Sequence, residues 1–250
     1  MSEIFQIFRK IILRPDEIVE IALQNVAPSS CTTDYIKNNF SRLVESIQID
    51  AYEEYLKNEK VCGKTAIKEF LKSHLESTKK SSDPIELIAS NFTELDRFFL
   101  SLTQSRRSRA GSAFEDIIKN LFKRLSYQFD EQIVINGAPD FLMPSEAHYK
   151  TNAMDCIIFT AKRTLRERWR QIVTEGTRGL GFYLATIDAK VSQPQLGEMK
   201  SNRIYLVVPE SLKTTIPHYS SAPNVISFED FFDNHLDPAV KRWKRAKVIK

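Results

Sequence analysis

Residues 138–150 read APDFLMPSEAHYK, and residues 154–175 read MDCIIFTAKRTLRERWRQIVTE. A Pro-Asp pair opens the first stretch, and in the second a run that is nearly all apolar ends in a lysine, Lys162. Such a run is typical of a strand that is buried on both faces of a sheet. A basic, amphipathic segment with helical character follows the lysine and carries Glu175. These stretches predict two neighbouring strands with an acid and an amine at their ends, followed by a helix.

Outward from these stretches, strands continue to alternate with helices over the second half of the chain. The pair Asn136-Gly137 is a turn signal after a short strand, and Pro209 ends a later one. This alternation predicts an α/β fold in which a mixed sheet is flanked by helices. We expect strands at 133–135, from 140, at 154–161, 182–187, 203–208 and 225–226, and helices at 111–127, 165–177 and 228–235.

The first hundred residues have a different pattern. Apolar residues recur there at helical spacing, which predicts helices from residue 2 to about residue 99. In the last of these segments Asp83 can cap a helix that Pro84 begins. We therefore predict a helical N-terminal subdomain at 1–105, which makes contacts to DNA or to a second subunit, and an α/β core at 106–250. The breakers between the helical segments are Pro15, Pro28, Gly63 and 81–84.

The composition of the 250-residue chain is that of an ordinary globular protein, with 42% hydrophobic and 27% charged residues. No apolar run has membrane-spanning length, and Arg9 and Lys10 interrupt the N-terminal apolar stretch, unlike a signal peptide. We therefore expect a cytoplasmic protein with no membrane partner. The three cysteines and four histidines are scattered, which argues against a disulfide framework and a zinc site. The net charge of +4 indicates little by itself, so the clustering of basic residues matters more.

Four residues of the expected α/β core are candidates for a metal-dependent site. Pro139 lacks an N–H and suits the mouth of a sheet, where Asp140 is accessible to an ion. Lys162 ends a buried strand, so its amine needs a partner or a shifted pKa. Glu115 lies beside the apolar face of an expected helix, and Glu175 lies about three turns into the helix after Lys162. Carboxylates of this kind favour Mg²⁺, which is bound through one or two of them together with waters and phosphate oxygens.

Each member of this set also has an interpretation without function. Asp140 alone can be an ordinary aspartate at the start of a strand, and Lys162 can extend its stem along apolar surface to reach solvent. Glu115 can be a carboxylate at the edge of a surface helix. The combination of an acid and a lysine at the ends of neighbouring strands is what favours a site.

Basic and acidic residues just after Lys162 are candidates for reading DNA. Arginine donates two hydrogen bonds to guanine and glutamate accepts one from cytosine, so the run 166–168 (Arg-Glu-Arg) can address adjacent G·C pairs. The competing interpretation is a solvated helix face with ordinary charge pairing. A second basic cluster favours contacts to phosphate groups, which position a protein on DNA without reading its sequence. The candidate residues are Arg166, Glu167 and Arg168 for bases, and Arg106, Arg107 and Arg109 for phosphates.

Several ordered blocks resemble one family of DNA-cleaving enzymes. The blocks are SRRSRAGSAFEDIIKNLF, PDFLMPSEAHYK, AKRTLRERWRQIVTEG and NRIYLVVPESL. They are similar to the restriction endonucleases formed by the EcoRII catalytic domain, PspGI and SsoII, over roughly residues 104–213. The resemblance implies the PD-(D/E)xK nuclease fold, Mg²⁺ as cofactor, and double-stranded DNA as substrate. It further implies cleavage before the first C of CCWGG or CCNGG, which leaves five-base 5′ overhangs. The first hundred residues contain no matching block.

The resemblance also assigns roles to individual residues. Asp140 matches the core metal ligand and Lys162 the catalytic lysine. Many nucleases of the broader fold have an acid two positions before the lysine, where this chain has Thr160, so Glu175 has to supply the displaced second acid. The other matched positions are Glu115 as an additional acid, Tyr149 near the site, Arg166, Glu167 and Arg168 as readers of G·C pairs, and Gln104 at the central base pair.

Members of this group flip the central bases of their target into protein pockets, and the resemblance implies the same here. Phe40, Tyr52 and Tyr55 are the aromatic candidates for that pocket, although each also suits the core or the surface. A near-palindromic target implies a symmetric homodimer with one active site per strand.

Other functions have to be weighed against a prokaryotic type II restriction endonuclease. A repair or recombination nuclease of the same fold would recognise DNA structure and would not need the 166–168 run. A DNA-binding regulator without catalysis is disfavoured by the intact set of Asp140, Lys162 and Glu175. A helical interaction protein is disfavoured by the buried strands after residue 130.

Overall fold

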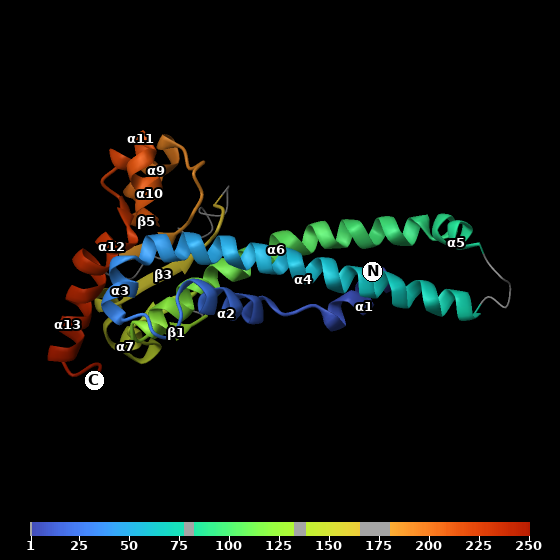
Figure 1. Cartoon of the computed structure of the whole chain (residues 1–250). Helices are drawn as coiled ribbons and strands as arrows, with labels where there is room; N and C mark the ends of the chain where they lie inside the picture. Colours follow the sequence, from blue (N-terminus) through green and yellow to red (C-terminus); the bar gives the residue numbers. More distant parts are fainter. Residues whose placement is uncertain (1, 78–82, 133–138, 166–180) are drawn as a thin grey trace.

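The computed structural model of the chain describes residues 2–77, 83–132, 139–165 and 181–250. A mixed sheet forms the centre of this part of the molecule, with its strands in sequence order from one edge to the other (Figure 1). Antiparallel pairing joins the first three strands, and the others are parallel. The strands are β1 (Asp130–Glu131), β2 (Phe141–Met143), β3 (Ile157–Ala161), β4 (Gly181–Ala185), β5 (Ile204–Val208) and β6 (Val225–Ser227).

Nearly continuous apolar runs form the middle of the sheet, as the sequence predicts. Every residue of β3 and of β4 is buried. Because successive side chains of a strand point to opposite faces, Phe159 of β3 lies in a larger hydrophobic core and Ile158 in a smaller one on the other face. The expected strand at 133–135 and nearly all of the expected helix at 165–177 lie outside the described residues.

The larger core joins the N-terminal helices to the sheet. Phe122 lies at its centre, and its ring is 5.7 Å from that of Phe40 and 5.2 Å from that of Phe159. These three residues come from α6 (Phe92–Arg124), α4 (Phe40–Ser77) and β3. Phe40 is fully buried, so of the three aromatic candidates for a base pocket it belongs to the core.

A long arm is formed by α4 and α6, which run side by side beyond the sheet (Figure 1). The short helix α5 (Pro84–Ser90) lies near its outer end, and Asp83 caps α5 by accepting from the N–H of Ile85, as the sequence predicts. No helix of the described residues combines the length and the apolar character that crossing a bilayer requires. The remaining N-terminal helices are α1 (Glu3–Ile11), α2 (Pro15–Val26) and α3 (Thr33–Asn38).

Two local predictions about the first half differ from the structure. Gly63 does not break a helix but lies inside α4, and the helix expected at 111–127 is the second half of α6. A glycine in a helix costs about 1 kcal/mol relative to alanine. Burial of its neighbours Cys62 and Ala66 in the larger core outweighs that cost. The boundary expected between residues 105 and 106 falls inside α6, so a single helix spans both parts.

Smaller helices cover the other face of the sheet. Leu196 of α9 (Gln193–Ser201) and Tyr219 of α11 (Pro217–Ser220) are buried in the smaller core. The hydroxyl group of Tyr219 donates to the carbonyl of Asp188 at 2.6 Å and accepts from the N–H of Val191 at 3.1 Å. This tyrosine therefore fixes the loop that follows β4. The helix α10 (Glu210–Thr215) lies beside these two (Figure 1).

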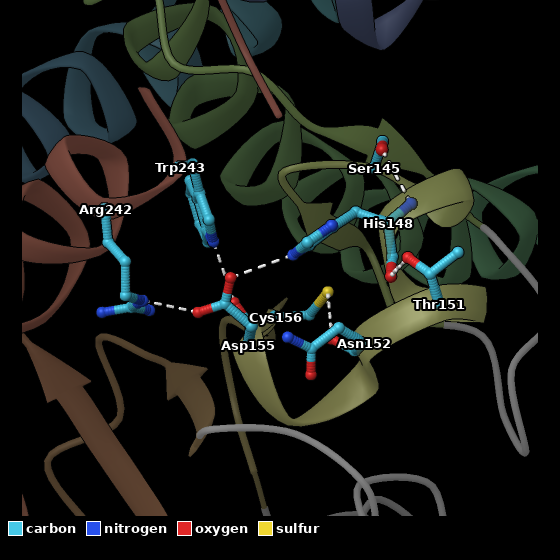
Figure 2. Close-up of polar contacts among 8 residues, drawn as sticks. All are labelled: Ser145, His148, Thr151, Asn152, Asp155, Cys156, Arg242 and Trp243. Atoms are coloured by element: carbon cyan, nitrogen blue, oxygen red, sulfur yellow. Dashed lines mark hydrogen bonds and ion pairs between the residues drawn. The ribbon is translucent and has the colours of Figure 1, made fainter. Parts of the chain in front are cut away.

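The C-terminal helix is attached to the start of β3 through Asp155 (Figure 2). Arg242 donates from Nε to Asp155 Oδ1 at 2.6 Å, His148 Nε2 lies 2.9 Å from Oδ2, and the Trp243 indole donates to the backbone carbonyl at 2.9 Å. Arg242 and Trp243 belong to α13 (Asp237–Arg245). The helix α13 continues α12 (Phe228–Phe231) and the π-helical turn η2 (Phe232–Leu236), where the sequence predicts a helix. His148 belongs to α7 (Glu146–Asn152), and Asp155 belongs to η1 (Ala153–Asp155).

Candidate functional site

Strand pairing brings Asp140 and Lys162 together. Phe141 pairs with Phe159, so Asp140, the residue before β2, lies opposite Thr160 near the end of β3 and close to Lys162, which follows that strand. The Nζ atom of Lys162 is 3.0 Å from Oδ1 of Asp140 and 2.9 Å from Oδ2. The N–H of Ala161 also donates to Oδ2, at 2.8 Å. The two residues that the sequence places at neighbouring strand ends thus form a direct ion pair.

The ion pair is buried at one end and open at the other. The side chain of Asp140 is 7% exposed, whereas that of Lys162 is 33% exposed. A buried carboxylate needs a charged or hydrogen-bonding partner, and Lys162 and the N–H of Ala161 supply both kinds. The lysine amine is therefore held at the boundary between the protein and solvent, where a charged substrate can approach it.

Glu115 of α6 belongs to the same electrostatic environment. Burial raises the pKa of its carboxyl group, the negative charge of Asp140 raises that pKa further, and Lys162 acts in the opposite direction. The side chain of Gln132 hydrogen-bonds Glu115, and its backbone N–H donates to the carbonyl of Asp140 at 3.3 Å. Two carboxylates and one ammonium group thus lie together, although the sequence separates them by up to 47 positions in its numbering.

The oxygen atoms of Asp140 and Glu115 are of the kind that binds a hard divalent cation. Oxygen ligands from carboxylates are those that Mg²⁺ prefers, and the hydroxyl oxygen of Thr160, which is buried in β3, has no hydrogen-bond partner among the described residues. The residues that the structure describes contain no group of three His, Cys, Asp or Glu side chains able to hold a metal. The third predicted acid, Glu175, lies outside the described residues, as do Arg166, Glu167 and Arg168.

Two arginines of the second basic cluster have partners inside the protein. Arg106 donates from Nε to both carboxylate oxygens of Glu59, each at 3.0 Å, and the side chain of Glu59 is only 7% exposed. The Arg109 guanidinium lies 5.4 Å from the centre of the Tyr55 ring and donates to the carbonyl of Leu13 at 2.7 Å. These arginines therefore connect α6 to α4 and to the start of α2.

Gln104 and Arg107 of α6 are exposed, and Arg107 lines a groove next to the ion pair. The groove has a volume of about 740 Å³ and lies between α4, α6 and the segments that follow β3 and β4. Arg106 and Arg163 also line it, and Arg163 directly follows Lys162. A groove lined by three arginines, and also by Glu45 and Glu53, thus begins one residue away from the ion pair.

Two further residues give this groove its chemical character. Tyr52 of α4 lines the groove and is half exposed. Gln48, one helical turn before it, is 8% exposed, and its Oε1 atom has no hydrogen-bond partner among the described residues. Sequence reasoning missed Gln48 and Arg163. The proximity of Arg163 to Lys162 was an available signal, whereas nothing in the sequence distinguishes Gln48.

Tyr149 lies in α7, between the end of β2 and the start of β3. The antiparallel register places that end of the strands opposite the end that carries Asp140 and Lys162. The tyrosine is partly buried and packs against the smaller core. The structure thus connects Tyr149 with packing, and its predicted place near the site remains a proposal.

The model of the family described as "EcoRII C terminal" matches residues 64–232 of this chain. The chain belongs to the EcoRII C-terminal family. The matched range begins within α4 and includes Glu115, Asp140 and Lys162, whereas Gln48 and Tyr52 of the groove precede it.

Two type II restriction enzymes are similar to this family member. One is SsoII of Shigella sonnei, 26% identical over 227 residues, which make up 86% of this chain and 73% of that enzyme. The other is EcoRII of Escherichia coli, 32% identical over 142 residues, which make up 53% of this chain and 35% of that enzyme. This EcoRII-family chain is thus an enzyme of the type II restriction endonuclease family.

Solved restriction endonucleases have the same fold as this chain. Ecl18kI, determined without metal in complex with uncleaved DNA, superimposes with a TM-score of 0.80 and 26% identity, over 95% of this chain and 83% of that one. PspGI, determined with substrate DNA, superimposes with a TM-score of 0.65 and 21% identity, over 92% of this chain and 94% of that one. The predicted α/β fold, a restriction-endonuclease-like mixed sheet flanked by helices with a helical N-terminal part, is confirmed.

Proposed function

We propose that this chain is a Mg²⁺-dependent, site-specific endonuclease that cleaves double-stranded DNA. The ion pair between Asp140 and Lys162, with Glu115 beside it, is the observation that carries this proposal. It places carboxylate oxygens and an amine at one end of a sheet, next to a groove that three arginines line. SsoII and Ecl18kI support the proposal, since one is a type II restriction enzyme and the other has been determined with DNA.

Each residue of the site would contribute a separate part of the reaction. Asp140 and Glu175 would hold the cation, and Glu115 would add negative charge beside them. The bound cation lowers the pKa of water and stabilises negative charge on the phosphate. Lys162, already fixed by the two oxygens of Asp140, orients the attacking water and offsets negative charge that develops at the phosphate.

For recognition, we propose a CCNGG or CCWGG target that is cut before the first C. Arg166 and Arg168 would donate to guanines, Glu167 would accept from cytosine, and Gln104 would contact the central pair. This proposal rests on the match of residues 166–168 to the family pattern. Arg168→Ala should weaken binding to the target by about 1–3 kcal/mol and relax the preference for G·C pairs, which competition binding against altered targets would measure.

The groove beside the ion pair is the proposed pocket for a flipped central base. Of the aromatic candidates, Tyr55 is buried and its hydroxyl donates to Glu59 at 2.6 Å, whereas Tyr52 lines the groove with half of its surface exposed. Stacking of a base on an aromatic ring contributes about 1–3 kcal/mol. The unpartnered oxygen of Gln48 would then accept from the edge of the base.

We further propose that the enzyme acts as a homodimer in the cytoplasm, where it meets foreign DNA. A near-palindromic target presents equivalent scissile bonds on both strands, and a two-fold symmetric pair of subunits brings one site to each. Arg107 and Arg163, on the exposed side of the groove, would contribute phosphate contacts that hold each subunit on its half-site.

Sequencing the DNA ends that the enzyme produces tests this function. Phage DNA is incubated with the purified chain and Mg²⁺, and all fragment ends are sequenced. We expect every end to map to one short recurring sequence with five-base 5′ extensions. Ends without a common sequence, or cleavage confined to branched or mismatched DNA, would contradict the proposed restriction activity and would favour a structure-specific nuclease of the same fold.

A further inference from the structure

The hydroxyl group of Thr160 is buried in the middle of the sheet without a partner. Thr160 is 2% exposed, and its Oγ1 atom has no hydrogen bond to any of the described residues. Buried hydroxyl groups are nearly always hydrogen-bonded, because burial without a bond loses the hydrogen bonds that water would make. A valine has the same branched shape and suits a buried strand equally well. The oxygen therefore calls for a function that packing does not provide.

Strand geometry places this hydroxyl group beside Asp140. Side chains alternate along β3, so Thr160 shares a face with Ile158, which belongs to the smaller core. By the same alternation Asp140 shares that face with Leu142 of β2. The pairing of Phe141 with Phe159, continued by one residue, sets Asp140 opposite Thr160. Side chains directly opposite in an antiparallel pair have Cβ atoms about 4.5–5.5 Å apart.

The existing hydrogen bonds of Asp140 leave the hydroxyl group free for another partner. Both carboxylate oxygens of Asp140 already accept from Lys162, and one of them also accepts from the N–H of Ala161. Thr160 therefore lies opposite the proposed metal ligand and two residues before the proposed catalytic lysine, without a hydrogen bond from its hydroxyl group to either. It also occupies the position where the broader nuclease fold often has an acid.

We propose that Thr160 is a positioning residue of the metal centre, and that its hydroxyl group hydrogen-bonds the hydration shell of the divalent cation. This inference rests on the proposed Mg²⁺-dependent function. Mg²⁺ keeps several of its waters when it binds to a protein, and those waters need partners that orient them. A neutral hydroxyl group supplies such a partner without the charge of an acid, opposite the carboxylate of Asp140. Loss of an outer partner of this kind typically weakens metal binding 10–100-fold.

Two substitutions separate this role from a structural one. Thr160→Val removes the hydroxyl group and keeps the shape, whereas Thr160→Ser keeps the hydroxyl group. The affinity of the full chain for Mn²⁺, used as a spectroscopic substitute for Mg²⁺, is measured by electron paramagnetic resonance. We expect Thr160→Val to raise the dissociation constant about tenfold and Thr160→Ser to leave it near the wild-type value. Equal affinity of the wild-type and Thr160→Val proteins would overturn the assignment.

Two further measurements keep the outcome decisive. Without metal, Thr160→Val should unfold at the wild-type temperature or above it, because the substitution removes an unpartnered buried oxygen. If that protein fails to fold, Thr160→Ser and Thr160→Ala, which differ by one oxygen, are compared for Mn²⁺ in the same way, and equal affinities would overturn the assignment. Asp140→Asn should lose most Mn²⁺ binding. Unchanged binding by Asp140→Asn would reject the proposed metal centre itself, whereas lost binding by Asp140→Asn with normal binding by Thr160→Val would reject only the role of Thr160.

Discussion

At the scale of single residues, the site combines groups that would repel each other in the absence of a cation. Glu115 is half-buried, and both burial and the charge of Asp140 raise its pKa. A carboxyl group whose pKa is raised on folding destabilises the folded state once the pH rises above its unfolded value. Glu115 therefore costs stability at neutral pH, as expected of a group kept for its function.

Replacing Glu115 should separate stability from activity. Glu115→Gln is expected to raise the free energy of unfolding at pH 7 without metal by roughly 0.5–2 kcal/mol, because it removes a poorly solvated charge beside Asp140. Mg²⁺-dependent cleavage should fall. Asp116→Asn is the matched control, since burial also raises the pKa of Asp116 while the charges that act on it are those of Lys119, Asp16, Glu131 and Lys123. A control that loses as much cleavage as Glu115→Gln would contradict the assignment.

Neighbouring arginines of α6 should behave differently because only one has a buried partner. Arg106→Ala leaves the carboxylate of Glu59 buried without its ion pair, so we expect a loss of stability of about 1–3 kcal/mol. Arg107→Ala should change stability by less than about 0.5 kcal/mol. Instead it should weaken DNA binding, and the dependence of the DNA-binding constant on salt concentration should decrease by the amount expected for about one lost phosphate contact. Thermal unfolding and DNA binding at several salt concentrations test both, and the reverse assignment of effects would refute this division.

At the scale of secondary-structure elements, sequence patterns predicted the strands better than the helices. Buried runs identified β3, β4 and β5, and the Pro-Asp pair identified the start of β2, because strand burial leaves a local apolar signature. The continuity of α4 through Gly63 was not predictable, since it depends on packing against the distant α6. The partners of Arg106 and Arg109 were hidden for the same reason, because they lie on α4 and next to α2.

The attachment of α13 to Asp155 predicts how stability depends on pH. Burial alone would raise the pKa of Asp155, but hydrogen bonds from His148 and Arg242 outweigh it and lower that pKa below its ordinary value of 3.8. The stabilisation is therefore present above that value and is lost as the pH falls through the lower folded pKa. Arg242→Ala should destabilise the protein by about 1 kcal/mol at pH 7, and the difference from the wild type should shrink below about pH 4.

Thermal unfolding between pH 3.5 and pH 7 checks this expectation. Arg245→Ala is the control, because Arg245 lies on the same helix, is exposed and has no partner among the described residues. It should change stability little at any of these pH values. A difference between wild type and Arg242→Ala that stays constant down to pH 3.5 would show that Asp155 is not the partner through which Arg242 acts.

At the scale of the whole molecule, one sheet supplies Asp140 and Lys162 of the proposed active site, and a helical arm supplies surface around them. The arm formed by α4 and α6 carries Glu115 at its base and Tyr52, Arg106 and Arg107 along the groove. The sequence predicted that Asp140 and Lys162 meet at the end of the sheet, but not that the N-terminal helices would form one wall of the neighbouring groove. That wall arises from the shared core around Phe122, which no local pattern reveals.

The proposed dimer has a simple expectation at this scale. In sedimentation experiments with a duplex that contains one target, the protein part of the complex should have twice the 28.9 kDa mass of the chain. Two subunits on one near-palindromic site also imply that both strands are cut during one encounter. A complex with a single subunit that nicks only one strand would contradict the symmetric arrangement.

The most direct test of the account is the separation of cleavage from binding at Lys162. In Lys162→Ala, Asp140 keeps the N–H of Ala161 but loses the amine that lies 2.9 Å from Oδ2. We predict that cleavage of target DNA with Mg²⁺ falls at least about 100-fold, while target affinity measured with Ca²⁺ stays within about threefold. Lys150→Ala, which removes an exposed lysine paired with Glu146, should cut normally. Undiminished cutting by Lys162→Ala would show that the reaction takes place elsewhere.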